Sequence, residues 1–337
     1  MKPTDFAQHV TIFLSKYLPG ERGLSTHTIE SYKYAFVLFV RFMKQKKNIA
    51  VTKLRLSDLT KDCVTGFLDW LGNTRGCSPA TRNVRLATIH SFVRFLQYRL
   101  PEKMAQWQNI LSIKEKRTGK KTISYLSVDG TKLLLEQPDT TTAKGRRDLA
   151  MLALMYDCGA RVQETIDLTP SDIRLHKPHT VRLTGKGNKT RIVPLMEEEV
   201  AHVKGYMEEK GLNKVHLSEA PLFCNKRKER LTRAGINSIL KKYVKDAKEK
   251  SPGLIPDNIS CHSLRHSKAM HLLQAGVNIV YIRDFLGHES VLTTEIYARV
   301  DSKQKRDALE KAYVQIVEKE TPVWVENDDL MQWLKRF

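Results

Sequence analysis

The chain reads Cys261-His262-Ser263-Leu264-Arg265-His266, then Leu286-Gly287-His288, then Tyr297, and a further arginine, Arg161, lies far upstream. Phosphodiester cleavage by a tyrosine needs such a set of groups. Two guanidiniums hold the non-bridging oxygens of one phosphate, histidines move a proton or donate to a phosphate oxygen, and a phenol is the nucleophile. No single member is decisive, but their order and spacing predict a phosphoryl-transfer site.

Arg161 follows a glycine break at Gly159 and begins a predicted helix in which Glu164 lies one turn later. A helix N-terminus offers free amides and positive potential, which suit a phosphate. Glu164 can pair with Arg161 and orient it. Taken alone, an arginine and a glutamate at this spacing are usually a surface ion pair.

His262 and Arg265 lie three residues apart at the start of a predicted helix, so both project from one face. That face presents a proton-transfer group beside a phosphate-binding group. Gly287 is a usual C-cap residue, so His288 should lie in the turn that follows. For each histidine alone a structural role is the alternative. His266 adds an imidazole, and His271, among apolar neighbours, is expected to be packed.

Tyr297 is one of eleven tyrosines, and a tyrosine on a short amphipathic helix is normally a core residue. Its position nine residues after His288 distinguishes it from the others. Because the reference pKa of a phenol is near 10, a nearby base or nearby cations would be needed for attack at neutral pH.

The composition indicates a basic protein with a polyanionic partner. The 337 residues are enough for two domains, and the formal net charge of +20 is spread along the chain. Nucleic acid is the expected partner. Solvated lysine faces or an anionic membrane surface are the alternatives.

No apolar run of about 18 residues and no signal-like start occurs, so we expect neither export nor a membrane span. The five cysteines form no C-x-x-C pair and read as reduced thiols of a cytoplasmic protein rather than as metal ligands. No metal site is predicted.

The predicted fold is mainly α. Residues 1–112 are helical by pattern, with start signals at Ser25, Thr60 and Ser78, and form the first domain. Basic side chains on its outward faces suit contacts to phosphates: Lys33, Arg41, Lys44, Arg82 and Arg85. Keeping a helical bundle soluble is the alternative role for any of them.

Residues 113–122 form a basic interdomain linker that contains Lys116, Arg117 and Lys120. It either lies along a DNA backbone or is a solvated tether. Residues 123–337 form a mostly α (α+β) domain with a small antiparallel sheet. Two short strands, 180–184 and 189–194, are joined by a tight turn with Lys186 at its tip.

Arg161 with Glu164, the hairpin lysine, His262-Ser263-Leu264-Arg265-His266, Leu286-Gly287-His288 and Tyr297 together resemble the tyrosine recombinase (integrase) family. Thr28-Ile29-Glu30-Ser31-Tyr32 and Ser78-Pro79-Ala80-Thr81-Arg82-Asn83 are similar to its helical, SAM-like core-binding domain, so the resemblance spans almost the whole chain. It implies a site-specific recombinase of the Xer-like or transposase type that acts on double-stranded DNA, and it leaves open whether the task is DNA integration, transposition of a mobile element, inversion or dimer resolution.

The resemblance also implies roles. Arg161 and Arg265 would bind the scissile phosphate, and Tyr297 would form a 3′-phosphotyrosyl link. Lys186, or Lys189 in the same turn, would protonate the leaving 5′-oxygen; His262 would be the general base, and His288 would donate to the phosphate. Neither a metal nor ATP is implied, and no cofactor is expected.

The family acts as a tetramer on two duplexes, so we expect a homo-oligomer here. The apolar residues of a tail at about 308–337 predict docking on an adjacent protomer, with packing on the tail's own domain as the alternative. A type IB topoisomerase and a non-cleaving DNA-binding regulator are the other functions considered. No particular accessory protein is indicated.

Overall fold

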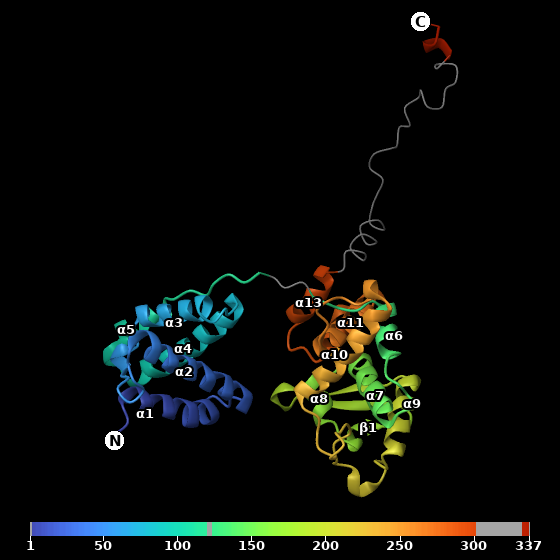
Figure 1. The fold of residues 1–337 in the computed structure, drawn as a ribbon, viewed down its shortest axis with the longest axis horizontal. Coiled ribbons are helices and arrows are strands. Elements are labelled where there is room, and N and C mark those ends of the chain that lie inside the picture. Colours follow the sequence, from blue (N-terminus) through green and yellow to red (C-terminus); the bar gives the residue numbers. More distant parts are fainter. Residues whose placement is uncertain (1, 120–122, 301–331, 337) are drawn as a thin grey trace. The chain divides into compact units, whose positions relative to one another are not determined.

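The computed structural model describes residues 2–119, 123–300 and 332–336, without the side chains of Lys186 and of residues 298–300. The chain divides into two compact units, Met1–Lys121 and Thr122–Phe337 (Figure 1). Helices predominate, and the described residues contain one small antiparallel sheet, so the predicted fold class is confirmed. None of the described helices is long and apolar enough to cross a bilayer.

The first unit is helical throughout its regular structure. Its elements are α1 (Asp5–Ile12), η1 (Phe13–Glu21), α2 (Thr26–Lys47), η2 (Leu56–Asp58), α3 (Lys61–Asn73), α4 (Pro79–Arg99), η3 (Pro101–Lys103) and α5 (Met104–Leu111). Two of the predicted start residues act as side-chain caps, because the hydroxyls of Thr60 and Ser78 accept from the amides of Cys63 and Thr81; Ser25 occupies the N-cap position of α2 without a side-chain cap bond. The sequence pattern did not reveal that η1 is a π-helix, nor did it reveal α5.

Stacked and edge-on aromatic rings fill the core of the first unit. Phe92 of α4 lies with its ring centroid 5.1 Å from that of Phe36 on α2 and 5.2 Å from that of Phe13 on η1. Such pairs add to the stabilisation from burial. The apolar stripes read from the sequence therefore do face one another.

One predicted surface residue is buried. Arg82 is 6% exposed, so its expected position on an outward face is wrong. The reason is helical periodicity: Leu86, Ile89 and Val93 follow Arg82 at four, seven and eleven residues, and all are buried on one stripe of α4. Arg82 Nε has no hydrogen-bond partner among the described residues.

The other predicted DNA contacts differ in exposure. Among the described residues, five of the predicted contacts are exposed: Lys33, Arg41, Lys44, Lys116 and Arg117. Arg85 is partly buried: its Nη1 donates to Ser31 O at 3.1 Å, and its guanidinium lies over the Tyr34 ring. Lys120 lies outside the described residues.

The second unit carries the sheet. Its helices are α6 (Val128–Leu135), α7 (Ala143–Asp157), α8 (Val162–Asp167), α9 (Glu197–Glu209), α10 (Arg233–Lys250), α11 (Cys261–Gln274), α12 (Ile279–Leu286) and α13 (Val291–Val300), with short 3₁₀ turns η4 (Pro170–Asp172), η5 (Lys186–Asn188), η6 (Val215–Leu217) and η7 (Pro252–Leu254). The predicted hairpin consists of β2 (Thr180–Thr184) and β3 (Thr190–Pro194), and the two-residue strand β1 (Ile173–Arg174) adds to β2.

The hairpin turn places the predicted lysine in η5. Gly185 N donates to Lys189 O at 2.8 Å and closes the turn, within which Gly187 adopts a φ of 73°. The Lys186 side chain lies outside the description, as does most of the predicted docking tail.

Helix α11 lies at the centre of the second unit and packs against α6, α7, α12 and α13. Its face toward α12 and α13 forms a small core in which Ala269, Met270 and Leu273 contact Ile282 and Tyr297. Because α11 also carries His262 and Arg265, this packing determines where those side chains lie.

Candidate active site

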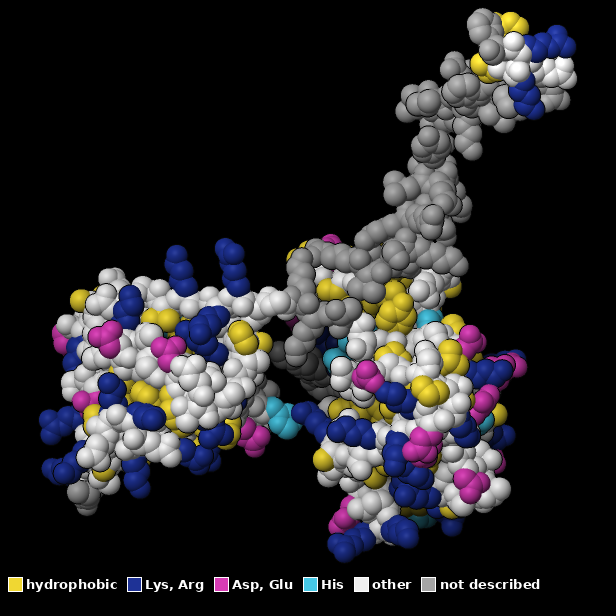
Figure 2. All heavy atoms as spheres, turned by 45° about the horizontal axis from the view of Figure 1, so that its top comes forward, with side chains coloured by type: hydrophobic (Ala, Val, Ile, Leu, Met, Phe, Trp, Pro, Cys, Tyr) yellow, Lys and Arg dark blue, Asp and Glu magenta, His cyan; other side chains and the backbone are white. Residues whose placement is uncertain are grey.

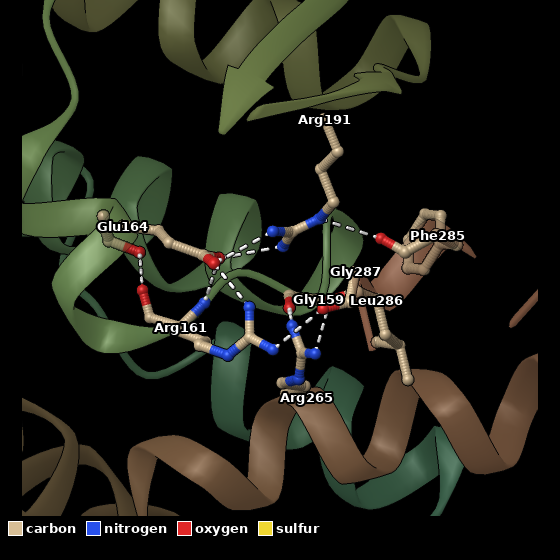
Figure 3. Close-up of polar contacts among 9 residues, drawn as sticks. Gly159, Arg161, Glu164, Arg191, Arg265, Phe285, Leu286 and Gly287 are labelled. Atoms are coloured by element: carbon tan, nitrogen blue, oxygen red, sulfur yellow. Dashed lines mark hydrogen bonds and ion pairs between the residues drawn. The ribbon is translucent and has the colours of Figure 1, made fainter. Parts of the chain in front are cut away.

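A single carboxylate organises two arginines from different elements (Figure 3). Glu164 Oε1 accepts from Arg161 Nη1 at 2.7 Å and from Arg191 Nη1 at 2.9 Å, and its Oε2 accepts from Arg191 Nη2 at 2.8 Å and from the Arg161 amide at 2.8 Å. Arg191 comes from β3 and also donates to Phe285 O at 3.0 Å. The predicted pair of Arg161 and Glu164 is therefore one half of a buried cluster.

The carboxylate of Glu164 is held in its charged form. Burial alone would raise its pKa, but the hydrogen bonds and charge of Arg191, and then the bonds from Arg161, outweigh burial and lower the pKa to about 2. A carboxylate that stays ionised fixes the direction of both guanidiniums.

Arg265 lies beside this cluster on α11 and is 2% exposed. Its Nη1 donates to Gly159 O and its Nη2 to Leu286 O, both at 2.5 Å. Burial and the neighbouring charges of Arg161 and Arg191 lower the pKa of Arg265, although a guanidinium remains protonated at any ordinary pH. The protein thus holds three guanidiniums around one carboxylate.

Two glycines allow this close assembly. A Cβ at Gly185 would lie 2.8 Å from Glu164 Oε1, so a side chain there would displace the carboxylate. Gly287 ends α12 with a φ of 63°, a conformation that favours glycine, and its carbonyl accepts from Arg161 Nη2 at 3.2 Å.

A pocket of about 400 Å³ opens beside Arg161. Its lining includes Lys189, Arg191 and His288, and also Glu289, whose carboxylate pairs with Lys189 at 2.7 Å. Because that pair offsets the lysine charge, the positive charge of the pocket comes from the two arginines, which suit an anion with several oxygens.

His288 lies in the turn after α12, as predicted, and its Nδ1 contacts Thr294 Oγ1 at 2.9 Å. Burial and the charges of Arg265, Arg161 and Arg191 lower the pKa of His288 to about 4. Its imidazole is therefore neutral at physiological pH. The contact with Thr294 fixes the ring orientation and leaves Nε2 for another partner.

The remaining predicted groups gather along α11 and α13. His262 and His266 lie one turn apart on α11, with ring centroids 5.3 Å apart. His266 Nδ1 lies 2.8 Å from the hydroxyl of Tyr297. Burial raises the pKa of Tyr297 to about 12, against the lowering effect of Arg265 and Arg161. Burial, Arg265 and Arg161 lower the pKa of His262.

The structure thus brings Arg161, Glu164, Arg265 and His288 together, with His262 and Tyr297 within electrostatic range of the arginines. Sequence reasoning missed Arg191, which on β3 looks like an ordinary strand residue. It noticed His266 but gave it no role. The only signal for Arg191 was a basic residue beside the hairpin turn.

Comparison with known proteins identifies the family. The model of the phage integrase family matches residues 124–304, and that of the phage integrase N-terminal SAM-like domain matches residues 13–99. The chain belongs to the phage integrase family of tyrosine recombinases. This recombinase is 34% identical over 310 residues to the putative integrase/recombinase y4rC of Sinorhizobium fredii (strain NBRC 101917 / NGR234). The aligned region covers 92% of each chain.

It is also 32% identical over 303 residues to tyrosine recombinase XerC of Myxococcus xanthus, covering 88% of this chain and 95% of that one. The fold resembles the XerH site-specific recombinase bound to palindromic difH substrate in a post-cleavage complex, with a TM-score of 0.67 and 22% identity over 86% of this chain and 81% of that chain. The recombinase is therefore a Xer-like enzyme that cleaves and rejoins DNA.

Proposed function

We propose that this recombinase cuts a DNA strand by attack of Tyr297 on a phosphodiester held by Arg161 and Arg265. The attack would leave a 3′-phosphotyrosyl link and a free 5′-hydroxyl. The observation that carries the proposal is the excess of positive charge: three guanidiniums surround a single ionised carboxylate beside an open pocket. A bound phosphate would supply the missing negative charge, and it would gain more as charge develops in the transition state.

A comparison of two tyrosines supports Tyr297 as the nucleophile. Tyr156 and Tyr297 both contact a histidine Nδ1 of α11, at 2.9 and 2.8 Å. Burial and Asp157 raise the pKa of Tyr156 to about 12, whereas Tyr297 has Arg265 and Arg161 nearby, which stabilise a phenolate. Tyr156 is partly buried and has Lys268 over its ring, whereas Tyr297 is buried beside the two arginines that would also hold the phosphate, and this favours Tyr297 for the attack.

The other members of the site have proposed roles that follow from the resemblance. His288 would donate to a phosphate oxygen through the nitrogen that Thr294 leaves free. Lys186, on the turn beside the pocket, would protonate the leaving 5′-oxygen. Because one phosphoester bond forms as another breaks, the step needs no external source of energy.

DNA would be bound through exposed basic side chains of the first unit, such as Lys33, Arg41 and Lys44, and through Lys116 and Arg117 of the linker. Figure 2 shows lysine and arginine side chains spread over the visible face of each unit. Such contacts to phosphates position a protein on a duplex without reading its sequence.

We further propose that four protomers act together. Exchange between two duplexes requires four strand cleavages, and each chain would supply one nucleophile, Tyr297. A tetramer is the smallest assembly that meets this requirement. Site-specific recombination, rather than the relaxation carried out by a topoisomerase, would follow from this assembly.

The experiment begins by sequencing DNA that is covalently trapped by the protein, which supplies the target site. A nicked suicide duplex containing that site then loses the cleaved fragment and accumulates the adduct. We expect Tyr297→Phe to abolish the adduct and Tyr281→Phe, a substitution of an exposed tyrosine on α12, to leave it unchanged. An undiminished adduct with Tyr297→Phe would remove Tyr297 from the mechanism. Binding without any adduct in the unsubstituted protein would indicate a non-cleaving regulator.

A further inference from the structure

His266 contacts the atom that would attack the phosphate. It follows Arg265 directly on α11, and its Nδ1 lies 2.8 Å from the Tyr297 hydroxyl oxygen. The two ring centroids are 5.6 Å apart. This separation of heavy atoms is within the range that a proton transfer requires.

The direction of the hydrogen bond follows from the protonation states. Burial, and then the neighbouring His262 and Arg265, lower the pKa of His266 to about 4, so the imidazole is neutral at physiological pH. The Tyr297 phenol, with its raised pKa, carries its proton. The phenol therefore donates and His266 Nδ1 accepts, which places the imidazole proton on Nε2.

His262, by contrast, has no such contact. Within the described part of the chain its ring meets that of His266, edge to face, and no hydrogen bond joins it to Tyr297. His262 is the residue for which the family resemblance implies the role of general base. In this structure the histidine one turn later, His266, contacts the Tyr297 hydroxyl.

We propose that His266 Nδ1, rather than His262, takes the proton of Tyr297 when the phenol attacks, and this inference rests on the proposed function of Tyr297. As the bond from Tyr297 Oη to phosphorus forms, the Oη–H bond breaks and its proton moves to Nδ1. The bond from phosphorus to the 5′-oxygen breaks, and that oxygen takes a proton from another donor. Rejoining reverses each step, and the imidazolium returns its proton to Tyr297.

The bound substrate helps the transfer. A phosphodiester held by Arg265 offsets a positive charge that disfavours protonation of His266 in the free protein. The hydrogen bond also directs the phenol proton away from the phosphate and leaves an oxygen lone pair for the attack. The same contact therefore orients the nucleophile and removes its proton.

The test compares three variants of the full chain on the suicide duplex. His266→Asn retains an acceptor near the position of Nδ1 but has no basic nitrogen, and His266→Ala has neither. We expect both to slow adduct formation by about 100-fold or more. The matched control is His271→Asn on the same helix, which likewise keeps an acceptor toward the Tyr156 hydroxyl but loses the contact of Nε2 to Leu126 O, and it should change the rate by less than about threefold.

A second measurement separates proton transfer from misfolding. A fluorinated tyrosine at position 297 has a more acidic phenol and needs a base less. We expect the fluorinated tyrosine to raise the rate of adduct formation by His266→Asn at least tenfold. A misfolded variant would show no such recovery. A His266→Asn rate equal to that of the unsubstituted protein, or rescue seen in His262→Asn but not in His266→Asn, would overturn the proposal. Absence of any adduct in the unsubstituted protein would instead refute the proposed function.

Discussion

Replacing Glu164 by glutamine should destabilise the second unit strongly, although the two side chains are nearly isosteric. The carboxylate accepts four hydrogen bonds from Arg161 and Arg191. A glutamine amide retains one oxygen, and its NH₂ group faces guanidinium donors. The substitution therefore loses at least two hydrogen bonds and leaves the buried arginines without their counter-charge.

The magnitude follows from the pKa of Glu164. Its reduction from 4.5 to about 2 corresponds to about 3 kcal/mol in favour of the charged, folded form. Because the folded-state pKa is the lower one, this contribution is fully present above about pH 4.5 and is lost as the pH falls toward 2. At pH 7 we therefore expect Glu164→Gln to reduce the free energy of unfolding by about 3 kcal/mol, which is roughly a 100-fold change in the opening equilibrium.

Hydrogen exchange read by mass spectrometry is the suitable assay, because it reports on helices of the second unit separately from those of the first unit. Peptides from α7 and α11 should exchange about 100-fold faster, while peptides from α4 remain unchanged. Glu209→Gln, which removes a more exposed partner of Arg146, is the control and should change exchange by less than about fivefold. Exchange in α11 that stays within threefold of the unsubstituted protein would refute the reasoning.

Three further predictions concern other parts of the molecule. Arg191→Lys, which loses the paired contact to Glu164, should slow adduct formation about tenfold or more, whereas Arg182→Lys at an exposed site should not. Burial and then Asp157 raise the pKa of Glu199, so the folded protein should lose stability as the pH rises above about 4.5. Calorimetry should show Glu199→Gln to be more stable than the unsubstituted protein at about pH 8 and equally stable at about pH 4. A stability difference that does not change with pH would contradict this. Lys44→Ala should reduce the slope of log affinity for DNA against log salt by about one, and Arg82→Ala should leave the slope unchanged; equal slopes for Lys44→Ala and the unsubstituted protein would exclude that phosphate contact.

Local signals in the sequence predicted most of the helices. Thr60 and Ser78 accept hydrogen bonds at the expected helix starts. These signals depend on neighbouring residues and so can be read without tertiary information. The two residues of β1 are too few to show a pattern, and η1 has apolar spacing close to that of an ordinary helix.

The contacts within the site were less accessible to sequence reasoning. Arg191 joins Glu164, 27 residues away, and Phe285, 94 residues away. No local pattern encodes such pairings, because they depend on how β3 and α12 pack. The burial of Arg82 was different, since its place on the apolar stripe of α4 could have been recognised from Leu86, Ile89 and Val93.

The central claim is that Tyr297 becomes joined to DNA through a 3′-phosphate. The most direct measurement is mass spectrometry of the trapped adduct after digestion with a protease and a nuclease. The account predicts a nucleotide joined through its 3′-phosphate to the phenol of Tyr297. A nucleotide on any other residue, or one attached through a 5′-phosphate, would contradict it.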